Sequence, residues 1–320
     1  MKKYTREIQT AVKGVIQAAS LTSHVQKILQ FEDTIQKDDR SPVTIADFSS
    51  QAIINKNLQA AFPDDPVIGE EESRPLHENP SIQQKVLKLL EPHIEGIDIS
   101  ELSNLIDHGC SRKNTGRYWT LDPIDGTKGF LRGEQYAVAL ALIENGRVVL
   151  GVMACPNYPS SSSGSLYHAI AGQGAFQQSL HNGGAKRLSV KTIESPLEAR
   201  FVESVEKDHA SKDVHAEITR KLGVKQKPFR IDSQCKYSVL AAGHASIYLR
   251  LHRNGGYREK IWDHAAGTII LAEAGGRVTD LDDKMLDFSE GTRLNTRGGI
   301  VATNGRLHEK VLNAANEVLA

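Results

Sequence analysis

The stretch Arg117–Phe130, RYWTLDPIDGTKGF, decides which fold and which site the sequence predicts. Its first part, Tyr118–Leu121, contains the aromatic and β-branched residues that favour a strand. The predicted strand leads directly into two carboxylates, Asp122 and Asp125. Pro123 stands between them and stiffens the backbone, because its ring fixes φ and removes an N–H donor. The stretch therefore predicts a rigid corner at the end of a strand.

The residues around this corner add further oxygen groups. Gly126 can adopt the positive φ that a tight turn requires, and Thr127 supplies a hydroxyl one residue later. Together with the Ile124 carbonyl, the corner would present the kinds of oxygen that hold Mg²⁺ in proteins. Asp-Pro and Asp-Gly are also ordinary turn signals, so a turn without any metal explains this stretch as well.

Length and composition are typical of a globular chain. The 320 residues suffice for one large domain or two medium ones with a sizeable core. Lysine plus arginine equals aspartate plus glutamate at 39 each, which argues against a nucleic-acid polymer or an anionic membrane as the main partner. Three cysteines without metal-ligand spacing and the lack of any long apolar run predict a cytoplasmic protein with reduced thiols. No feature indicates an obligate protein partner.

The spacing of apolar residues outlines the first half of the chain. It predicts helical structure over 4–29, helices over 45–61 and 81–90, a strand over 67–69, and hairpins over 137–155 and 166–177. Thr44 and Asp47 stand at the start of the second helix with the spacing of a capping box. Glu144-Asn145-Gly146 is a strong turn signal for the first hairpin.

The pattern changes after Gly183-Gly184. Strands are predicted near 200–204, 246–251, 276–281 and 299–302, and helices near 212–222, 234–242, 264–274 and 307–319. This alternation is typical of a second, smaller α/β unit. We therefore expect an N-terminal α+β domain over residues 1–185 and a C-terminal α/β domain over residues 186–320.

Several acidic residues fall at the ends of predicted strands or at the starts of predicted helices, where sites gather on α/β scaffolds. They are Asp47, Glu70, Asp122, Asp125 and Asp263. Glu70 also begins a run of three glutamates, which is typical of a solvated surface, and Asp263 would suit a helix N-cap. Asp47 would favour the positive end of its helix. If the five carboxylates do meet, they need cations to compensate their charge.

Basic and hydroxyl residues form a second candidate group in the second half. Ser233 and Lys236 open a predicted helix, whose N-terminal amides favour an anion. A lysine in the first turn is unfavourable against the helix dipole, so a bound phosphate would explain Lys236, although a solvated lysine costs little there. Arg250 ends an apolar strand and His209 lies in a polar loop, and each is equally explained as a surface group.

The order and spacing of three motifs resemble the lithium-sensitive, magnesium-dependent phosphomonoesterases of the inositol monophosphatase superfamily. The motifs are Gly69-Glu70-Glu71, Asp122-Pro-Ile-Asp125-Gly-Thr127 and Trp262-Asp263-His-Ala-Ala-Gly267. The resemblance runs nearly end to end. It implies a fold of mixed α+β and α/β character, the layered α-β-α-β sandwich of inositol monophosphatases and fructose-1,6-bisphosphatases.

Motifs of the second half are similar to the fungal and plant type of 3′(2′),5′-bisphosphate nucleotidase. They are Val205-Glu-Lys-Asp-His209, Asp232-Ser-Gln-Cys-Lys-Tyr237, Tyr248-Leu-Arg250 and Lys260-Ile-Trp-Asp-His-Ala-Ala-Gly267. This likeness implies hydrolysis of the 3′-phosphate of 3′-phosphoadenosine 5′-phosphate, and of its phosphosulfate analogue as a further substrate, in sulfate assimilation. The alternatives are an inositol phosphate phosphatase of the same superfamily and a non-catalytic, nucleotide-binding relative.

The resemblance also assigns roles to residues. It implies two to three Mg²⁺ ions on Glu70, Asp122, Asp125, Asp263 and the Ile124 carbonyl, water activation by Asp47 and Thr127, and nucleotide contacts from Thr127, His209, Ser233, Lys236 and Arg250. The loop at His209 reads Asp208-His209-Ala-Ser-Lys212, whereas the family often has Gly-His-Ser-Ser-His. An offset of a few residues there would move that contact.

Overall fold

The computed structural model describes residues 3–29, 33–37, 42–111, 116–160, 164–181, 183–205, 212–252 and 257–319. The helices are α1 (Thr5–Ile28), α2 (Ile45–Ala61), α3 (Arg74–His77), α4 (Pro80–Leu90), α5 (Ile99–Asp107), α6 (Thr127–Leu131), α7 (Lys212–Leu222), α8 (Cys235–Ala241), α9 (Ala265–Glu273) and α10 (His308–Leu319). The strands are β1 (Thr34–Gln36), β2 (Pro42–Thr44), β3 (Val67–Gly69), β4 (Arg117–Asp125), β5 (Ala137–Glu144), β6 (Arg147–Cys155), β7 (Ser165–Ile170), β8 (Gly174–Ser179), β9 (Lys186–Arg187), β10 (Phe201–Glu203), β11 (Phe229–Arg230), β12 (Ile247–Leu251), β13 (Arg277–Thr279) and β14 (Gly299–Thr303).

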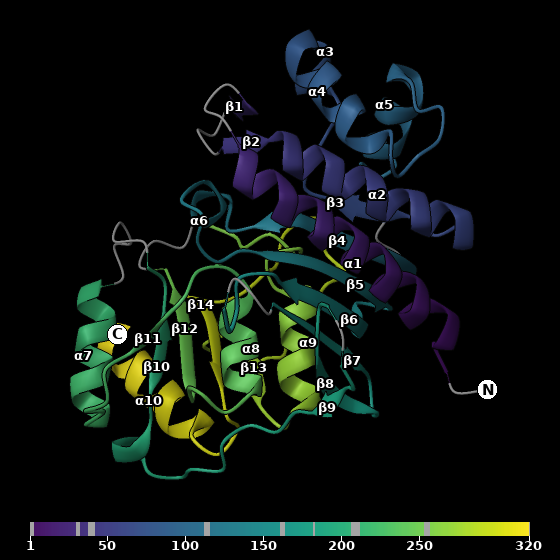
Figure 1. Ribbon diagram of the computed structural model, residues 1–320. Coiled ribbons are helices and arrows are strands. Elements are labelled where there is room, and N and C mark those ends of the chain that lie inside the picture. The colour runs from purple at the N-terminus through teal and green to yellow at the C-terminus, as the bar shows by residue number, and fades with distance from the viewer. Residues whose placement is uncertain are drawn as a thin grey trace.

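Helices α1 and α2 lie side by side on one face of a seven-stranded sheet (Figure 1). The sheet runs β3-β4-β5-β6-β7-β8-β9, with β3 parallel to β4 and each later neighbour antiparallel. The sequence of β5 is almost continuously apolar because both faces of this strand are buried. Leu140 and Leu142 pack toward α1 and α2, whereas Ala139 and Ala141 belong to the core on the opposite face.

Helices α8 and α9 form the layer between the two sheets (Figure 1). The second sheet has the order β11-β10-β12-β14-β13, in which β10 is parallel to β11 and β12, and β14 is antiparallel to β12 and β13. Helices α7 and α10 cover its outer face. Three hydrophobic cores result. One lies between α1/α2 and the first sheet, one surrounds α8 and α9 between the two sheets, and one lies between the second sheet and α7/α10.

Most predicted elements are confirmed, and some to the residue. The helix predicted over 45–61 is α2, and the helix predicted over 212–222 is α7. The predicted hairpin turn at Asn145-Gly146 has the two positive φ values, 51° and 74°, that a type I′ turn requires. The sequence patterns missed short elements, since these carry few periodic positions. They are the helices α3, α5 and α6 and the strands β1, β2, β9 and β11.

The change from one sheet to the other falls between β9 and β10. The division into domains over 1–185 and 186–320 stays a prediction. Over the part of the chain that the structure describes, no helix combines the length and the apolar character needed to cross a membrane.

Two glycines allow the middle helical layer to pack tightly. A Cβ on Gly151 of β6 would lie 2.6 Å from Cγ2 of Ile269 on α9, and one on Gly267 of α9 would lie 2.2 Å from Cδ2 of Tyr237 on α8. Nonbonded heavy atoms essentially never lie so close to a Cβ atom. Helix α9 can therefore occupy this position only if both residues lack a side chain. This packing fixes where the segment before α9, which carries Asp263, meets the first sheet.

We expect Gly267→Ala to lower the free energy of unfolding by about 1–3 kcal/mol, because the new methyl group overpacks the contact with Tyr237. Gly14→Ala in α1 is the matched control. A Cβ there would meet Asn57 Cβ at 3.6 Å, an ordinary contact, so better helix propensity should raise stability by about 0.5–1 kcal/mol. Urea unfolding of both variants measures the difference, and equal effects would contradict this account of the packing.

Candidate active site

The first helix turn of α2 holds Asp47 in a reciprocal capping box. Its Oδ2 accepts hydrogen bonds from the backbone N–H of Thr44 at 2.8 Å and from the Thr44 hydroxyl at 2.7 Å. The Thr44 Oγ1 in turn accepts from the N–H of Ala46 at 3.1 Å. The predicted capping box is therefore confirmed, and it orients the carboxylate of Asp47.

The second carboxylate oxygen of Asp47 is available for chemistry. Asp47 is 1% exposed, and its Oδ1 has no hydrogen-bond partner within the described ranges. Burial raises the pKa of Asp47 to about 7, against the hydrogen bonds from Thr44 and the positive charge of Lys37, which lower it. A carboxylate with such a pKa can accept a proton near neutral pH.

Glu70 and Glu71 follow β3, at the edge where β3 runs parallel to β4. Lys37, just past the end of β1, contacts both, at 2.6 Å from Glu71 Oε1 and 3.4 Å from Glu70 Oε1. Glu71 is buried and ion-paired, so the interpretation of the run as a fully solvated surface is wrong for it. Only Glu72 is exposed, and the side chain of Glu70 keeps 27% of its surface accessible.

Strand β4 delivers Asp122 and Asp125 to the same corner. A register shift against β5 falls between the two, which is where Pro123 interrupts the ladder. Asp122 is 1% exposed, and its Oδ1 accepts from the N–H of Ile124 at 3.1 Å. The Ser50 hydroxyl of α2 donates to the Pro123 carbonyl at 2.9 Å, which joins this corner to the helix that carries Asp47.

The pKa of Asp122 shows how many carboxylates converge. Burial raises it well above its usual value, and the negative charges of Glu70, Asp125, Asp263 and Asp47 add to the rise. The fold therefore brings together all five acidic residues that the sequence singled out. Their mutual repulsion makes this cluster the candidate cation site.

The turn after β4 is built as its residues predict. Gly126 has φ of +91°. A side chain at this position would crowd Ser233, because a Cβ on Gly126 would lie 3.1 Å from the Cβ of Ser233. The Thr127 hydroxyl donates to the Ile124 carbonyl at 3.2 Å. That carbonyl keeps a second lone pair, so the hydrogen bond leaves it able to bind a cation.

The turn that enters α8 packs directly against Asp125. The N–H of Gln234 donates to Asp125 Oδ2 at 2.6 Å, and Ser233 next to it has a positive φ of 65°. Burial raises the pKa of Asp125 to about 6, although the charge of Lys236 and the Gln234 hydrogen bond lower it. The second half of the chain thus completes the surroundings of a carboxylate from the first half.

Lys236 is 4% exposed, so the alternative of a solvated surface lysine is wrong. Its Nζ lies 5.5 Å from the ring centroid of Tyr248 and makes no hydrogen bond or ion pair to the residues that the structure describes. The charge of the lysine acts on Asp125. A buried ammonium without a direct anionic partner suits the recognition of a phosphate.

Asp263 lies in a turn before α9 and is not its N-cap, because the N-cap is His264 and has no side-chain cap bond. The N-cap interpretation of Asp263 is therefore wrong. Partial burial raises its pKa well above the usual range, and the charge of Asp125 raises it further, whereas Arg250 lowers it. Of the five carboxylates, Asp263 alone comes from the second half of the chain.

Arg250 is held by a buried glutamate. Its Nε donates to Oε1 of Glu259 at 2.6 Å, and His252 Nε2 lies 2.5 Å from the same oxygen. His264 Nε2 lies 3.3 Å from Glu259 Oε2, and His264 Nδ1 lies 2.8 Å from the Tyr237 hydroxyl. Arg250 is thus positioned by an ion pair at the edge of the carboxylate cluster and is no isolated surface group.

Glu259, Asp263 and His264 offer ligand atoms within 4.8 Å of one another, which makes them a second conceivable metal group. However, both Glu259 oxygens and both ring nitrogens of His264 already take part in the network around Arg250. This trio therefore forms a hydrogen-bonded support for Arg250, and the cluster around Asp122 remains the candidate metal site.

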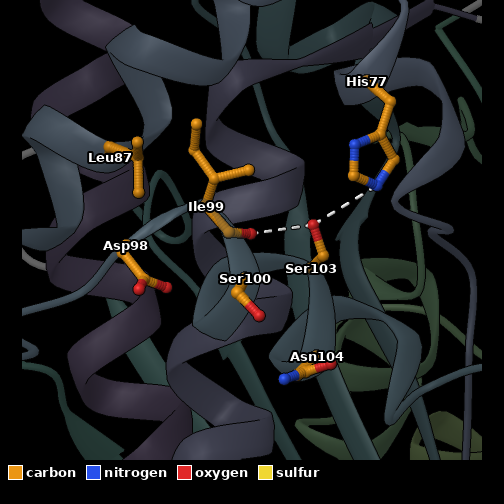
Figure 2. A pocket seen from close by; sticks show the side chains of 7 residues that line it. All are labelled: His77, Leu87, Asp98, Ile99, Ser100, Ser103 and Asn104. Atoms are coloured by element: carbon orange, nitrogen blue, oxygen red, sulfur yellow. Dashed lines mark hydrogen bonds between the residues drawn. The ribbon is translucent and has the colours of Figure 1, made fainter.

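Two surface cavities lie away from these residues. One of about 620 Å³ is lined by His77, Leu87, Asp98, Ile99, Ser100, Ser103 and Asn104 (Figure 2). The Ser103 hydroxyl there donates to the Ile99 carbonyl at 2.9 Å and lies 3.4 Å from His77 Nε2, so the serine is not activated as a nucleophile. The other, of about 600 Å³, lies between α1 and α4 and contains no residue of the candidate site.

The structure assembles most of the residues that the sequence indicated. The exception is His209, which lies outside the described residues. Sequence reasoning missed four residues that support the site: Lys37, Glu71, Gln234 and Glu259. Glu71 and Gln234 lie inside quoted motifs and Glu259 directly precedes another, but no residue type predicts these contacts, which depend on the fold.

Comparisons with known proteins show the family of the chain. The chain matches the inositol monophosphatase family over residues 2–320. It is 43% identical to 3′(2′),5′-bisphosphate nucleotidase 2 of Candida albicans, with 98% of each chain covered. It is 45% identical to the probable 3′(2′),5′-bisphosphate nucleotidase 4 of Arabidopsis thaliana, covering 98% of this chain and 95% of the relative.

A solved structure confirms the expected fold class. An IMPase of Thermotoga maritima superimposes with a TM-score of 0.68 at 23% identity, covering 98% of both chains. The layered sandwich that the motifs implied is therefore the fold of this protein. The chain belongs to the inositol monophosphatase family.

Proposed function

We propose that the protein is a Mg²⁺-dependent phosphomonoesterase that hydrolyses the 3′-phosphate of 3′-phosphoadenosine 5′-phosphate to AMP and phosphate. The observation that carries the proposal is the contact between the carboxylate corner and the turn of Lys236, through the Gln234–Asp125 hydrogen bond. A substrate with two phosphates fits this pair of features, one phosphate at each. The bisphosphate nucleotidases at 43–45% identity support the same substrate.

The donor set fits Mg²⁺. Glu70, Asp122, Asp125, Asp263 and the Ile124 carbonyl supply hard oxygen ligands, and Asp122 is buried among like charges that need compensation. Two Mg²⁺ ions would balance the charge of four carboxylates, and the resemblance implies two to three. When bound, Mg²⁺ would polarise the phosphoryl oxygens and lower the pKa of a nearby water.

The chain's own groups would handle the proton. Asp47 presents its unpaired Oδ1 and has a pKa of about 7, so it is suited to take a proton from the attacking water. Thr44 fixes the other oxygen and so keeps Oδ1 in one orientation. Thr127, whose hydroxyl donates to the Ile124 carbonyl, would help to orient the water and the scissile phosphate.

Substrate recognition would come from the second half. Lys236 offers a buried ammonium, Ser233 a hydroxyl on the same turn, and Arg250 a guanidinium held by Glu259. These groups would bind the 5′-phosphate and so distinguish a bisphosphate from a monophosphate. The contact assigned to His209 stays a prediction.

A phosphate-release assay with Mg²⁺ tests the proposal. We expect the highest kcat/KM with 3′-phosphoadenosine 5′-phosphate and much lower values with inositol 1-phosphate and inositol 1,4-bisphosphate. Faster release from an inositol phosphate would replace the proposed substrate. Tight nucleotide binding without any Mg²⁺-dependent release would indicate a non-catalytic relative. The phosphosulfate analogue, assayed alongside, defines the range of nucleotide substrates.

Asp122→Asn and Asp263→Asn should each lower the rate by about 10³-fold or more, because each removes a ligand charge that stabilises the transition state. Glu72→Gln is the control, since it neutralises an exposed carboxylate two residues from Glu70. It should leave the rate within about twofold. Near-normal turnover of either Asn variant at saturating Mg²⁺ would show that the assigned ligands are wrong.

Lys236→Met should raise KM for 3′-phosphoadenosine 5′-phosphate by about 10–100-fold, the usual cost of losing a charged hydrogen bond. For 3′-AMP, which lacks the 5′-phosphate, the change should be small. Lys225→Met removes an exposed lysine and should alter neither substrate. Equal losses with both substrates would mean that Lys236 does not recognise the 5′-phosphate.

The stabilisation by Mg²⁺ should increase with pH. Raised pKa values, about 7 for Asp47 and about 6 for Asp125, mean that the metal-free folded state keeps protons which the unfolded chain has lost. The carboxylates therefore stabilise the metal-free fold at low pH, and this contribution disappears as the pH rises through 6 and 7.

We expect the rise in Tm from saturating Mg²⁺ to be larger at about pH 8 than at about pH 5.5, where the cation must displace protons. Thermal scans with and without Mg²⁺ give this difference directly. Buried histidines such as His308, whose pKa is lowered to about 4 by burial, titrate alike in both scans and cancel. A rise in Tm that does not depend on pH would contradict the assignment of these carboxylates to the cation site.

A further inference from the structure

Gln234 makes contacts in three directions, although neither the sequence motifs nor the proposed mechanism gives it a role. It is 2% exposed. Its backbone N–H donates to Asp125 Oδ2 at 2.6 Å, and its side-chain Nε2 donates to the Trp262 carbonyl at 2.8 Å. Its Oε1 accepts from the N–H of Gly267 at 3.0 Å. All the hydrogen-bonding groups of its side-chain amide thus face the segment that contains Asp263.

The two side-chain contacts bracket Asp263. Trp262 is the residue before it, and Gly267 lies in the first turn of α9 after it. The helix start has no side-chain cap. The Gln234 amide holds both ends of the segment at the start of α8, and the Tyr237 hydroxyl of α8 contacts His264 Nδ1 between them. Through its backbone, the same residue holds the carboxylate of Asp125, which arrives on β4 from the first half of the chain.

This arrangement has an electrostatic consequence. Asp125 and Asp263 are carboxylates of the same corner, so their negative charges repel each other. Without a brace, the two carboxylates would relax apart in the metal-free protein. A cation would then have to draw them together on binding, and that reorganisation would reduce its affinity. Gln234 binds Asp125 through its backbone N–H and the Asp263 segment through its side-chain amide. It therefore holds the two ligands in place before the cation binds and removes this cost.

We propose that Gln234 is a positioning residue that sets the separation of Asp125 and Asp263 and thereby the affinity of the site for Mg²⁺. The inference rests on the proposed function for the identity of the cation. Glutamine fits because one planar amide supplies both the donor for the Trp262 carbonyl and the acceptor for the Gly267 N–H. Asparagine carries the same groups on a shorter side chain, and methionine has the same reach without them.

The test compares Gln234→Met with Asn304→Leu. Asn304 is an equally buried amide, whose Nδ2 donates to the carbonyls of Lys191 and Ile193 at 2.7 and 2.8 Å and whose Oδ1 accepts from Leu307 N at 3.1 Å. None of these partners belongs to the candidate site. The side-chain amide of Gln234 binds two backbone groups and that of Asn304 binds three. Both variants lose such a buried amide, so both should have a lower Tm.

Only Gln234→Met should change the response to Mg²⁺. We expect the half-saturating Mg²⁺ concentration to rise by about 10-fold or more, both in the Mg²⁺-induced shift of Tm without substrate and in the phosphate-release rate. At saturating Mg²⁺, kcat should recover to within a few-fold of the wild type. Asn304→Leu should keep the half-saturating concentration of the wild type by both measurements.

Gln234→Asn gives the same comparison if the Met variant fails to fold, and it tests the reach of the side chain. Equal Mg²⁺ half-saturation in the wild type and in both Gln234 variants would overturn the inference while leaving the proposed function intact. A kcat that stays low at saturating Mg²⁺ would also overturn it, because Gln234 would then act on more than affinity. If the wild type itself shows no response to Mg²⁺, the proposed function fails first.

Discussion

The mutual repulsion of carboxylates in a poorly solvated corner is the constraint around which this protein is built. Asp47 and Asp122 are almost fully buried, and Glu70, Asp125 and Asp263 lie close enough to raise the pKa of Asp122. A chain folds around such a group only if the surrounding packing holds it firmly and if protons or cations offset the negative charge. Much of the architecture can be understood as the means by which these five side chains are kept in one place.

Four separate segments supply the five carboxylates, because Asp122 and Asp125 share β4. The capping box of α2 orients Asp47, the parallel pairing of β3 with β4 sets Glu70 beside Asp122, and the turn before α9 carries Asp263. Gly151 of β6 lets α9 approach the first sheet, and Gly267 of α9 lets α9 pack against α8. Helix caps, strand register and close packing thus act together on the geometry of one small volume.

The three cations around the corner differ in whether a carboxylate of the protein binds them. Lys37 pairs directly with Glu70 and Glu71, whereas Lys236 is buried near Asp125 without a direct partner in the described structure. Arg250 is fixed by Glu259, which also engages two histidines. Lys37 balances acidic residues of the protein. Lys236 and Arg250 are placed so that both could bind a second phosphate of the substrate.

The sequence by itself determined the local features and the identity of the chemical groups. It predicted α2, α7 and the Asn145-Gly146 hairpin, because caps, apolar periodicity and positive-φ residues act over a few neighbours. It also indicated which carboxylates matter, through motifs and a family resemblance. Only the tertiary structure decided that Asp263 is no helix cap, that Lys236 is buried, and that Gln234 and Glu259 support the site. Burial and hydrogen bonds across the chain depend on which distant segments meet, and no local pattern encodes them.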